Sequence, residues 1–258
     1  MIVCGCDMGS RTAKAVLMAD KQILSSAVTY VNDKPEIVSQ KVFERILGEA
    51  NLSRSAIHRT VGTGYGAGRI PFADESKSEI ACHAKSAKWL LPSINMVIDI
   101  GGQDAKVMRV NEDGDIVKYV YNDICATGSG RFLEMIADVL GLKVEDIGHL
   151  SLQSKTPLSI SSQCVIFAET EIISLINKGC APNDILAGLH QSLAQRVAAL
   201  AKSIILEENI TFTGGAAKNI GLFQSLENSL GVKLIKMEIV DPQLNGAIGA
   251  ALFATAID

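Results

Sequence analysis

The sequence contains one eight-residue pattern twice, as Asp-Met-Gly-Ser-Arg-Thr-Ala-Lys at residues 7–14 and as Asp-Ile-Gly-Gly-Gln-Asp-Ala-Lys at residues 99–106. Asp, Gly, Ala and Lys coincide, and in both copies one apolar run precedes the pattern and another follows it. An apolar run that ends at Asp-x-Gly is typical of a buried strand followed by a turn. Because one strand-turn-strand unit occurs twice, we expect two similar domains rather than a solenoid, which needs more and shorter repeats.

The hydrophobic periodicity around these two turns predicts an α/β protein. Short β-branched runs that end in Gly or Asp are typical of strands, and longer runs between Pro or Gly residues are typical of helices. We expect strands at residues 2–6, 15–19, 23–30, 58–63, 95–100, 106–110, 116–121 and 210–213, with a hairpin tip at Asp20 and Lys21, and helices at residues 35–47, 76–91, 128–140 and 166–177, the first stopped by Gly48. The first domain is expected to span residues 1–93, with a helix at 243–258 packing back onto it, and the second to span residues 94–242.

The composition excludes several classes of protein. Of the 258 residues, 48% are hydrophobic and 20% are charged, which is enough apolar material for a packed core and excludes a disordered tail or a collagen-like fibre. The 24 Lys and Arg residues against 28 Asp and Glu residues give a net charge of −4, so we expect no nucleic-acid partner. No apolar run is long enough to span a membrane and no signal peptide opens the chain, so we expect a cytoplasmic protein with no membrane partner.

Three glycine turns are candidates for phosphate binding. A Gly after a strand allows a positive φ and removes the Cβ atom, so that successive backbone N–H groups can approach an anion. The residues Asp7 and Asp99, which precede two of these turns, can hold a hydrated Mg²⁺ ion through its water molecules. The third strand-to-turn junction is Thr-Gly-Gly-Ala at residues 213–216. Neither a P-loop nor a Rossmann glycine motif is present, so the sequence predicts another kind of nucleotide site.

The six cysteines are predicted to be reduced thiols or metal ligands, because we expect the chain to be cytoplasmic. Cys125 and Cys164 each come just before a predicted helix, whose N-terminus stabilises a thiolate. Spacing alone leaves two interpretations of this pair open, buried thiols or metal ligands. Cys82 and its neighbour His83 are expected to be ordinary helix residues rather than half of a metal site. The remaining cysteines are expected to be core or helix-end residues: Cys4, Cys6 and Cys180.

Three segments carry a resemblance to a known family: residues 97–104, residues 122–132 (Asn-Asp-Ile-Cys-Ala-Thr-Gly-Ser-Gly-Arg-Phe) and residues 164–169 (Cys-Val-Ile-Phe-Ala-Glu). They resemble the ATPase activator family of 2-hydroxyacyl-CoA dehydratases and benzoyl-CoA reductases, within the actin, Hsp70 and sugar-kinase superfamily. The resemblance covers essentially the whole chain and implies two duplicated actin-like ATPase (ribonuclease H-like) domains with a nucleotide cleft between them. It also implies that hydrolysis of ATP, with Mg²⁺, drives a low-potential electron to a partner iron–sulfur enzyme, with a ferredoxin or flavodoxin as donor.

The resemblance also assigns roles to residues. It implies a homodimer bridged by one [4Fe–4S] cluster, to which each subunit contributes Cys125 and Cys164. Asp7 and Asp99 are expected to hold the hydrated Mg²⁺ ion, and Gln103 is expected to orient the attacking water. The nucleotide is expected to contact Gly9, Ser10, Arg11, Thr12, Ala13, Lys14, Gly101, Gly102, Gly214, Gly215 and Gln243.

Two alternative functions stay open at this point. The chain could be an ATPase subunit built into a benzoyl-CoA-reductase-type complex instead of a separable activator of a dehydratase. It could also be a small-molecule kinase of the same superfamily, such as an N-acetylhexosamine kinase. Such a kinase would have no use for paired cysteines that precede two helices.

Overall fold

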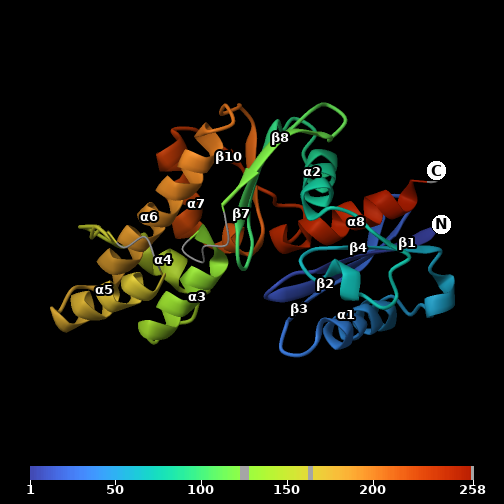
Figure 1. Ribbon diagram of the computed structural model, residues 1–258, viewed down its shortest axis with the longest axis horizontal. Helices are drawn as coiled ribbons and strands as arrows, with labels where there is room; N and C mark the ends of the chain where they lie inside the picture. Colours follow the sequence, from blue (N-terminus) through green and yellow to red (C-terminus); the bar gives the residue numbers. More distant parts are fainter. Residues whose placement is uncertain (123–127, 162–164, 257–258) are drawn as a thin grey trace. The chain divides into compact units, whose positions relative to one another are not determined.

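The computed structural model describes residues 1–122, 128–161 and 165–256, which form two five-stranded sheets and their helices (Figure 1). The chain divides into two compact units, each assembled from segments that are distant in sequence. The first unit contains Met1–Val97, Met108–Val117 and Met237–Asp258, and the second contains Ile98–Val107 and Lys118–Lys236. The domain boundaries expected from the sequence stay a prediction.

The first sheet is mixed and has the strand order β3-β2-β1-β4-β5. In the centre, β1 pairs antiparallel with β2 and parallel with β4, while β3 and β5 form the two edges. The hairpin tip expected at Asp20 and Lys21 is confirmed, since both residues have the positive φ, 49° and 61°, that a two-residue type I′ turn requires. The strands are β1 (Ile2–Met8), β2 (Thr12–Ala19), β3 (Gln22–Tyr30), β4 (Arg59–Thr63) and β5 (Glu75–Ser76).

Helices cover both faces of the first sheet, which is why β1 reads as an unbroken apolar run. Figure 1 shows α1 along one side of the sheet and α8, with α2 beside it, along the other. Side chains of a strand alternate between its faces, so Cys4 and Cys6 pack with Phe43 of α1, whereas Val3 packs with residues of α8 such as Ala251. The helices are α1 (Pro35–Glu49), α2 (Glu79–Leu90) and α8 (Asn245–Thr255).

The second sheet has the order β10-β9-β6-β7-β8. From its other edge, the order of this sheet is β8-β7-β6-β9-β10. If the five strands of each sheet are numbered 1 to 5 along the chain, both sheets have the order 3-2-1-4-5. The internal duplication expected from the repeated turn therefore extends to the topology of both sheets. The strands are β6 (Met96–Ile100), β7 (Ala105–Val110), β8 (Ile116–Tyr121), β9 (Ile210–Thr213) and β10 (Leu234–Ile235).

A buried polar network joins three helices of the second unit. His190 of α6 is 1% exposed, and its Nδ1 lies 2.9 Å from the Oγ atom of Ser151 in α4, while its Nε2 lies 3.1 Å from the Nδ2 atom of Asn219, which caps α7. The network is consistent with close packing of α4, α6 and α7 against one another. The helices of this unit are α3 (Gly130–Val139), α4 (Ile147–Ser151), α5 (Val165–Asn177), α6 (Pro182–Lys202) and α7 (Ile220–Leu230).

Several element boundaries differ from those expected. β1 continues to Met8, so Asp7 lies within the strand and not in the turn after it. Gly48 does not end α1, which continues to Glu49, and the positive φ of 53° at Asn51 follows the helix end. The helix expected from residue 76 begins at Glu79, because Ser76 pairs with Gly62 in the first sheet. The short elements β5, β10 and α4 were not expected, and no bounds were predicted for α6 and α7.

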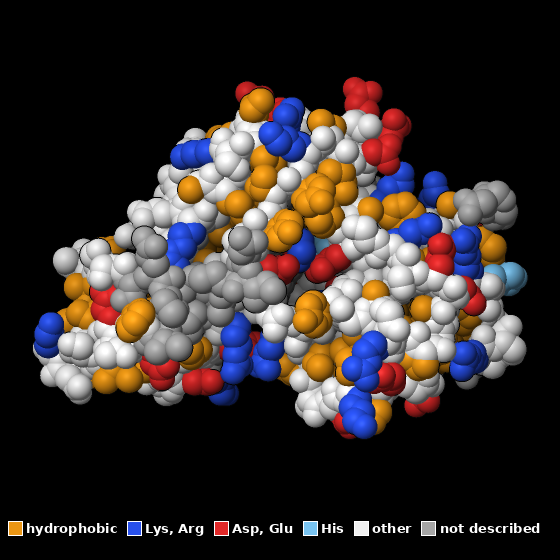
Figure 2. Space-filling view, viewed as in Figure 1, with side chains coloured by type: hydrophobic (Ala, Val, Ile, Leu, Met, Phe, Trp, Pro, Cys, Tyr) orange, Lys and Arg blue, Asp and Glu red, His pale blue; other side chains and the backbone are white. Residues whose placement is uncertain are grey.

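The surface carries charges of both signs. On the face drawn in Figure 2, Lys and Arg side chains alternate with Asp and Glu side chains, and the coloured residues form no broad area of one charge. Among the described residues, no helix combines the length and apolar character that crossing a bilayer requires.

Candidate functional site

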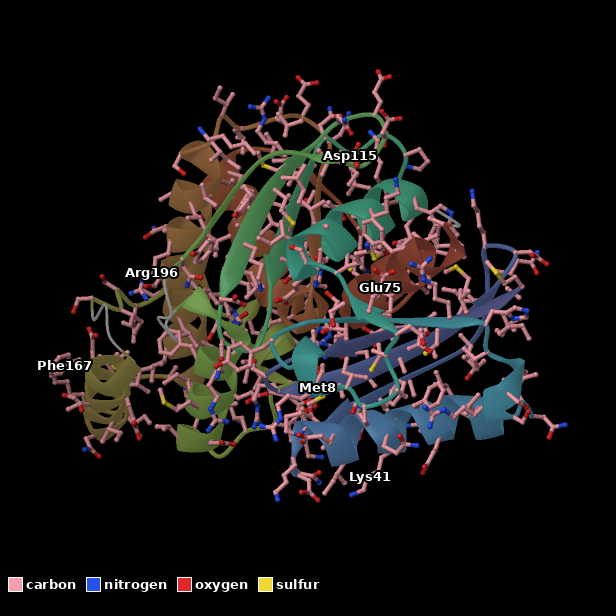
Figure 3. All side chains as sticks on the ribbon, turned by 45° about the vertical axis from the view of Figure 1, so that its right-hand side comes forward. Met8, Lys41, Glu75, Asp115, Phe167 and Arg196 are labelled. Carbon is pink, nitrogen blue, oxygen red and sulfur yellow. The ribbon has the colours of Figure 1, made fainter. Side chains whose placement is uncertain are left out.

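A buried carboxylate lies in β1, just before the first repeated turn. Asp7, next to the end of β1 at Met8 (Figure 3), is 2% exposed and faces Lys14 across the β1–β2 ladder. The Lys14 Nζ atom donates to Asp7 Oδ2 over 3.0 Å. The other carboxylate oxygen, Oδ1, is buried without a hydrogen-bond partner among the described residues. A buried charged oxygen without a partner is costly, so this atom fits a ligand such as the water shell of a cation.

Glycines from two other segments surround the Asp7 carboxylate. Gly64 has a φ of +88°, and a Cβ atom there would collide with Asp7 Oδ1. A Cβ atom on Gly246, at the start of α8, would lie 2.9 Å from Asp7 Oδ2. Both positions therefore require glycine, because the backbone approaches the carboxylate too closely for a side chain.

The second repeated turn has the same backbone geometry as the first. The Gly101 N–H donates to the Asp104 carbonyl oxygen over 3.0 Å, as the Gly9 N–H donates to the Thr12 carbonyl oxygen over 3.1 Å. The N-terminus of α3 also supports the second turn, because the Gly130 N–H donates to the Gly101 carbonyl oxygen over 2.8 Å. In both turns, backbone carbonyl oxygens already accept hydrogen bonds from backbone N–H groups of the protein. The other backbone N–H groups of the turns are suited to bind an anion.

The third junction lies beside the carboxylate of the second turn. Asp99 is 1% exposed, and the Thr213 hydroxyl donates to its Oδ1 atom over 2.9 Å. Gly214 has a φ of +85°, and a Cβ atom there would lie 2.9 Å from the same oxygen. The structure therefore brings together Asp99 and Gly214, which are 115 positions apart in the chain. Two strands that are neighbours in the second sheet, β6 and β9, carry them there.

Most of the other expected nucleotide contacts lie in these turns or next to them in the chain. Thr12 and Ala13 begin β2, and Ser10, Arg11 and Gly102 are half-buried in the turns themselves. Gln103 and Gly215 are exposed. Gln243 lies in a short 3₁₀ helix, where its N–H donates to the Asp241 carboxylate over 2.9 Å. The binding roles of these residues stay predictions.

The two expected cluster ligands, Cys125 and Cys164, lie outside the described residues. Helices begin soon after both of them, α3 at Gly130 and α5 at Val165. Near the start of α5, Phe167 is 69% exposed and projects from the helix into solvent (Figure 3). The role of the two cysteines as ligands of an iron–sulfur cluster therefore stays a prediction.

The cysteines that were expected to pack in the core do so. Cys4 and Cys6 are fully buried in β1, and burial raises the pKa of both thiols. Burial also raises the pKa of the Cys82 thiol to about 12. Such thiols stay protonated at neutral pH and are poor metal ligands. Cys180 is half-buried after the end of α5.

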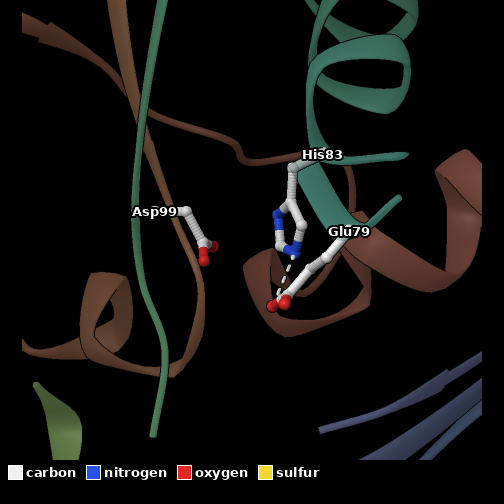
Figure 4. Close-up of side chains that lie close together, drawn as sticks. All are labelled: Glu79, His83 and Asp99. Atoms are coloured by element: carbon white, nitrogen blue, oxygen red, sulfur yellow. Dashed lines mark ion pairs between the residues drawn. The ribbon is translucent and has the colours of Figure 1, made fainter. Parts of the chain in front are cut away.

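Sequence reasoning missed one group of polar residues beside Asp7. His83, expected to be an ordinary helix residue, is 4% exposed, and the fully buried Asn245 lies against it. The Asn245 Nδ2 atom lies 3.0 Å from the His83 carbonyl oxygen and 3.2 Å from His83 Nδ1. Figure 4 shows Glu79 one turn earlier on α2, with its Oε1 atom 4.0 Å from His83 Nε2. The Glu-x-x-x-His spacing was the available signal, since it places both side chains on one helix face.

Comparison with known proteins gives full-length matches. The "(R)-2-hydroxyglutaryl-CoA dehydratase activating ATPase" of Acidaminococcus fermentans is 39% identical over 252 residues, which cover 97% of this chain and 95% of that protein. A subunit of the benzoyl-CoA reductase of Thauera aromatica is 34% identical over 263 residues, which cover 98% of this chain and 92% of that protein. A solved structure, the activator of the 2-hydroxyisocaproyl-CoA dehydratase from Clostridium difficile with bound ADPNP, aligns with a TM-score of 0.93 at 36% identity, covering 98% of this chain and 94% of that one.

These comparisons confirm the expected fold class, an α/β protein with two domains of the actin-like ATPase fold. They also explain why the three segments quoted from the sequence resemble one family so specifically, because the match extends over nearly the whole chain. The sequence pattern of that family matches residues 4–254. The chain belongs to the BadF/BadG/BcrA/BcrD ATPase family.

Proposed function

We propose that this protein is a Mg²⁺-dependent ATPase that activates a 2-hydroxyacyl-CoA dehydratase by delivering an electron to it. The full-length likeness to a dehydratase-activating ATPase supports the activity, and the likeness to an activator with bound ADPNP supports the nucleotide. The observation that carries the proposal is the buried Asp7 carboxylate. Its Oδ2 atom accepts a hydrogen bond from Lys14, and its Oδ1 atom has no hydrogen-bond partner among the described residues.

In this proposal the two repeated turns act on the phosphates of ATP. Asp7 and Asp99 hold water molecules of the hydrated Mg²⁺ ion, and that ion supplies charge neutralisation at the transferring phosphoryl group. Backbone N–H groups of both turns, and Lys14, bind phosphate oxygens. Gln103 is exposed and carries an amide that can orient the attacking water. Gly214, Gly215 and Gln243 contact the rest of the nucleotide.

The electron-transfer part of the proposal concerns Cys125 and Cys164. Two cysteines per chain supply half of the four thiolates that a [4Fe–4S] cluster commonly takes, and a two-fold homodimer would supply the other half. The cluster would accept an electron from a ferredoxin or flavodoxin and pass it to the partner enzyme. The helices that begin after both cysteines support the assignment, since helix N-termini stabilise negative charge.

An assay with both components tests this function. The anaerobically purified protein is mixed with a 2-hydroxyacyl-CoA dehydratase, a reductant, Mg²⁺ and ATP, and dehydration is followed with and without each component. Dehydration should require ATP that can be hydrolysed, and iron analysis should give about four iron atoms per two chains. ATP-dependent phosphorylation of a sugar by a protein without iron would contradict the proposal and favour the kinase alternative.

A second candidate follows from the likeness to a benzoyl-CoA reductase subunit, which is 34% identical over nearly the full length. In that case the same ATPase would be a permanent subunit of a reductase and not a separable activator. The two candidates differ in what copurifies with the chain when it is isolated from its own cells. A stable complex with further subunits supports the reductase role, whereas a homodimer that activates added dehydratase excludes it.

A further inference from the structure

A side chain from outside the repeat binds the backbone at the end of the second repeated turn. Ala105, the first residue of β7, comes directly after this turn and is 1% exposed. Its N–H group donates to the side-chain oxygen Oδ1 of Asn122 over 2.6 Å, and its carbonyl oxygen accepts from the Asn122 N–H over 3.1 Å. A buried backbone N–H needs a partner, and Asn122 supplies it.

Asn122 uses its side chain where a strand would use its backbone. In an antiparallel hairpin, two residues that form a hydrogen-bonded pair exchange both bonds through backbone groups. β8 ends at Tyr121, and the Ala105 N–H is bound by the Asn122 side chain in place of a backbone carbonyl group. Because an N–H group can only donate, the atom bound to it is the amide oxygen of Asn122 and not the amide nitrogen.

The first copy of the repeat needs no such side chain. There Tyr30, the last residue of β3, pairs with Thr12, and the Val31 N–H donates to the Arg11 carbonyl oxygen over 2.9 Å. Backbone groups therefore extend that ladder to the turn itself. In the second copy, the corresponding end of the ladder depends on one side chain.

The helix α3 holds the other side of the second turn. The Gly130 N–H donates to the Gly101 carbonyl oxygen over 2.8 Å. The Arg131 N–H donates to the Gly102 carbonyl oxygen over 3.1 Å. In a planar trans peptide the N–H points opposite to the C=O, so the N–H groups of Gly102 and Gln103 face away from α3. Among the residues that the structure describes, neither of these two N–H groups donates to a protein atom, which leaves them to bind an anion.

The side chain of Asn122 also contacts the chain just before α3. A Cβ atom on Gly128 would collide with the Asn122 amide nitrogen, so the Gly128 backbone lies directly against this side chain. Gly128 is buried and lies two positions before the start of α3. The amide group of Asn122 is therefore held between the start of β7 and the segment that leads into α3, and both of these elements bind the turn.

We propose that Asn122 is a positioning residue for the phosphate-binding turn at residues 101–104. It acts through the peptide group that joins Asp104 to Ala105. The N–H of this peptide group binds Asn122, and its carbonyl oxygen accepts from the Gly101 N–H over 3.0 Å, which closes the turn. Asn122 thereby fixes the plane of the closing peptide and, with it, the direction of the two outward N–H groups. This inference rests on the proposed binding of ATP phosphates by the turn.

Hydrogen exchange tests the contact without any measurement of activity. In the anaerobically purified full-length protein, the Ala105 N–H should exchange slowly, and in Asn122→Ala it should exchange about tenfold faster or more. Asn122→Asp keeps an accepting oxygen at the same place and should restore the slow exchange. Fast exchange of the Ala105 N–H in wild type would overturn the inference and leave the proposed ATPase function intact.

Nucleotide binding tests the positioning role. The Kd for ADPNP, an ATP analogue, is measured by calorimetry in the presence of Mg²⁺. Asn122→Ala should raise this Kd by about tenfold or more, because misdirected N–H groups lose hydrogen bonds to phosphate. Gly128→Ala should act in the same direction, since its methyl group displaces the Asn122 side chain. This second variant leaves Asn122 and the residues of the turn unchanged.

Asn111→Ala is the matched control. Asn111 lies at the opposite end of the β7–β8 hairpin, where its Oδ1 atom accepts from the N–H groups of Asp113 and Asp115 over 3.1 and 2.8 Å. The variant therefore loses the same kind of contact in the same hairpin, away from the turn. Its Kd for ADPNP should stay within about twofold of wild type, as expected for a distant site.

Two results would overturn the positioning role. One is a wild-type Kd in both Asn122→Ala and Gly128→Ala. The other is an equal rise of the Kd in Asn111→Ala, because the loss would then follow from any damage to the hairpin. If wild type itself binds no ADPNP, the proposed function fails, whatever the exchange of the Ala105 N–H shows.

Discussion

The two copies of the repeated turn share a backbone hydrogen bond and differ in side chains that lie near their carboxylates. In the first copy, Lys14 crosses the hairpin to bind Asp7 over 3.0 Å. In the second copy, the equivalent Lys106 binds Asp104 over 2.7 Å, and the Thr213 hydroxyl binds Asp99. The position of Asp104 is occupied by Thr12 in the first copy, so this acid belongs to the second turn alone. The comparison shows that the repeat specifies the turn, while the residues around it change the charges near the lysine.

Removing the charge from each carboxylate should have the largest effect. Asp7→Asn and Asp99→Asn keep the shape of the side chain and remove the charge that organises the water shell of Mg²⁺. We expect each variant to lower kcat for ATP hydrolysis by about 100-fold or more, the scale of losing one preorganised electrostatic contact. Steady-state kinetics with saturating Mg²⁺ measure this, and Asp20→Asn on the exposed hairpin tip is the control.

Asp7→Asn should also lower the stability of the fold. It leaves the ammonium group of Lys14, whose side chain is 13% exposed, without the charge of its carboxylate partner. Urea unfolding of Asp7→Asn beside wild type measures the loss. Wild-type turnover in both Asn variants would contradict the assignment of the two carboxylates, and an Asp7→Asn variant with wild-type stability would contradict a stabilising ion pair with Lys14.

The next comparison concerns Arg11 and Gln103, which occupy the same position of the repeat. If Gln103 orients the attacking water, Gln103→Ala should lower kcat by about 10- to 100-fold with little change in nucleotide binding. If Arg11 contacts the nucleotide, Arg11→Ala should raise KM for ATP more than it lowers kcat. Single-turnover hydrolysis and equilibrium binding of an ATP analogue separate these effects. Weak binding by Gln103→Ala would make Gln103 a binding residue and assign the water to another group.

The strands of the repeated unit were predictable because their signals are local. Each apolar run next to an Asp-x-Gly turn has the length and residue types of a buried strand, and β9 was expected with the bounds that the structure has. β5 and β10 are two residues long, so no periodicity could reveal them. They pair with β4 and β9 because tertiary packing brings the backbones together, and propensity has little part in that.

The contacts of the candidate site also fall into two classes, those that follow from local sequence and those that only tertiary packing creates. Asp7 and Lys14 belong to one hairpin, and their pairing follows from its register. The contact between His83 and Asn245 joins residues that are 162 positions apart, on two helices without any shared motif. A single sequence contains no signal for such a pair, because the two residues become neighbours only when α2 packs on α8. The helix spacing of Glu79 and His83 indicated a common face and nothing about the partner.

Two glycines test how closely the turns enclose their carboxylates. Gly64 and Gly214 have φ values of +88° and +85°, and a Cβ atom on either would meet a carboxylate oxygen, of Asp7 or of Asp99. Ala at either position should lower the free energy of unfolding by about 3 kcal/mol, the sum of backbone strain and steric overlap. Gly231, at the end of α7, has a φ of +77° with nothing near its Cβ position, so Gly231→Ala reports the strain alone, about 1 kcal/mol. Equal losses in urea unfolding of all three variants would show that the carboxylates are not closely enclosed.

The last prediction concerns His190, a buried histidine of the second unit, whose contacts fix its tautomer. Ser151 Oγ donates to the Gly148 carbonyl oxygen over 2.8 Å, so it accepts from His190 Nδ1. Asn219 Oδ1 accepts from the Leu222 N–H, so its Nδ2 donates to His190 Nε2. The neutral ring of His190 is therefore satisfied on both sides, with its hydrogen on Nδ1. Protonation would place a second N–H against the amide N–H of Asn219.

Burial lowers the pKa of His190 to about 4, below the ordinary value of 6.5. Between these values the unfolded chain binds the proton more readily than the folded one, so stability falls as the pH drops through 6.5 and the loss is complete below about 4. From pH 7 to pH 5 we expect this residue to account for a loss of about 2 kcal/mol in the free energy of unfolding.

The measurement is urea unfolding at both pH values, on wild type and on His190→Leu, with a variant of an exposed histidine, His149→Leu, as the control. The Leu variant starts from lower stability, because Ser151 and Asn219 lose their partner, but its decline toward acid pH should be smaller by that amount. An acid-side decline in the Leu variant that matches wild type would show that His190 binds a proton equally well in the folded and unfolded states, which would contradict the buried neutral ring.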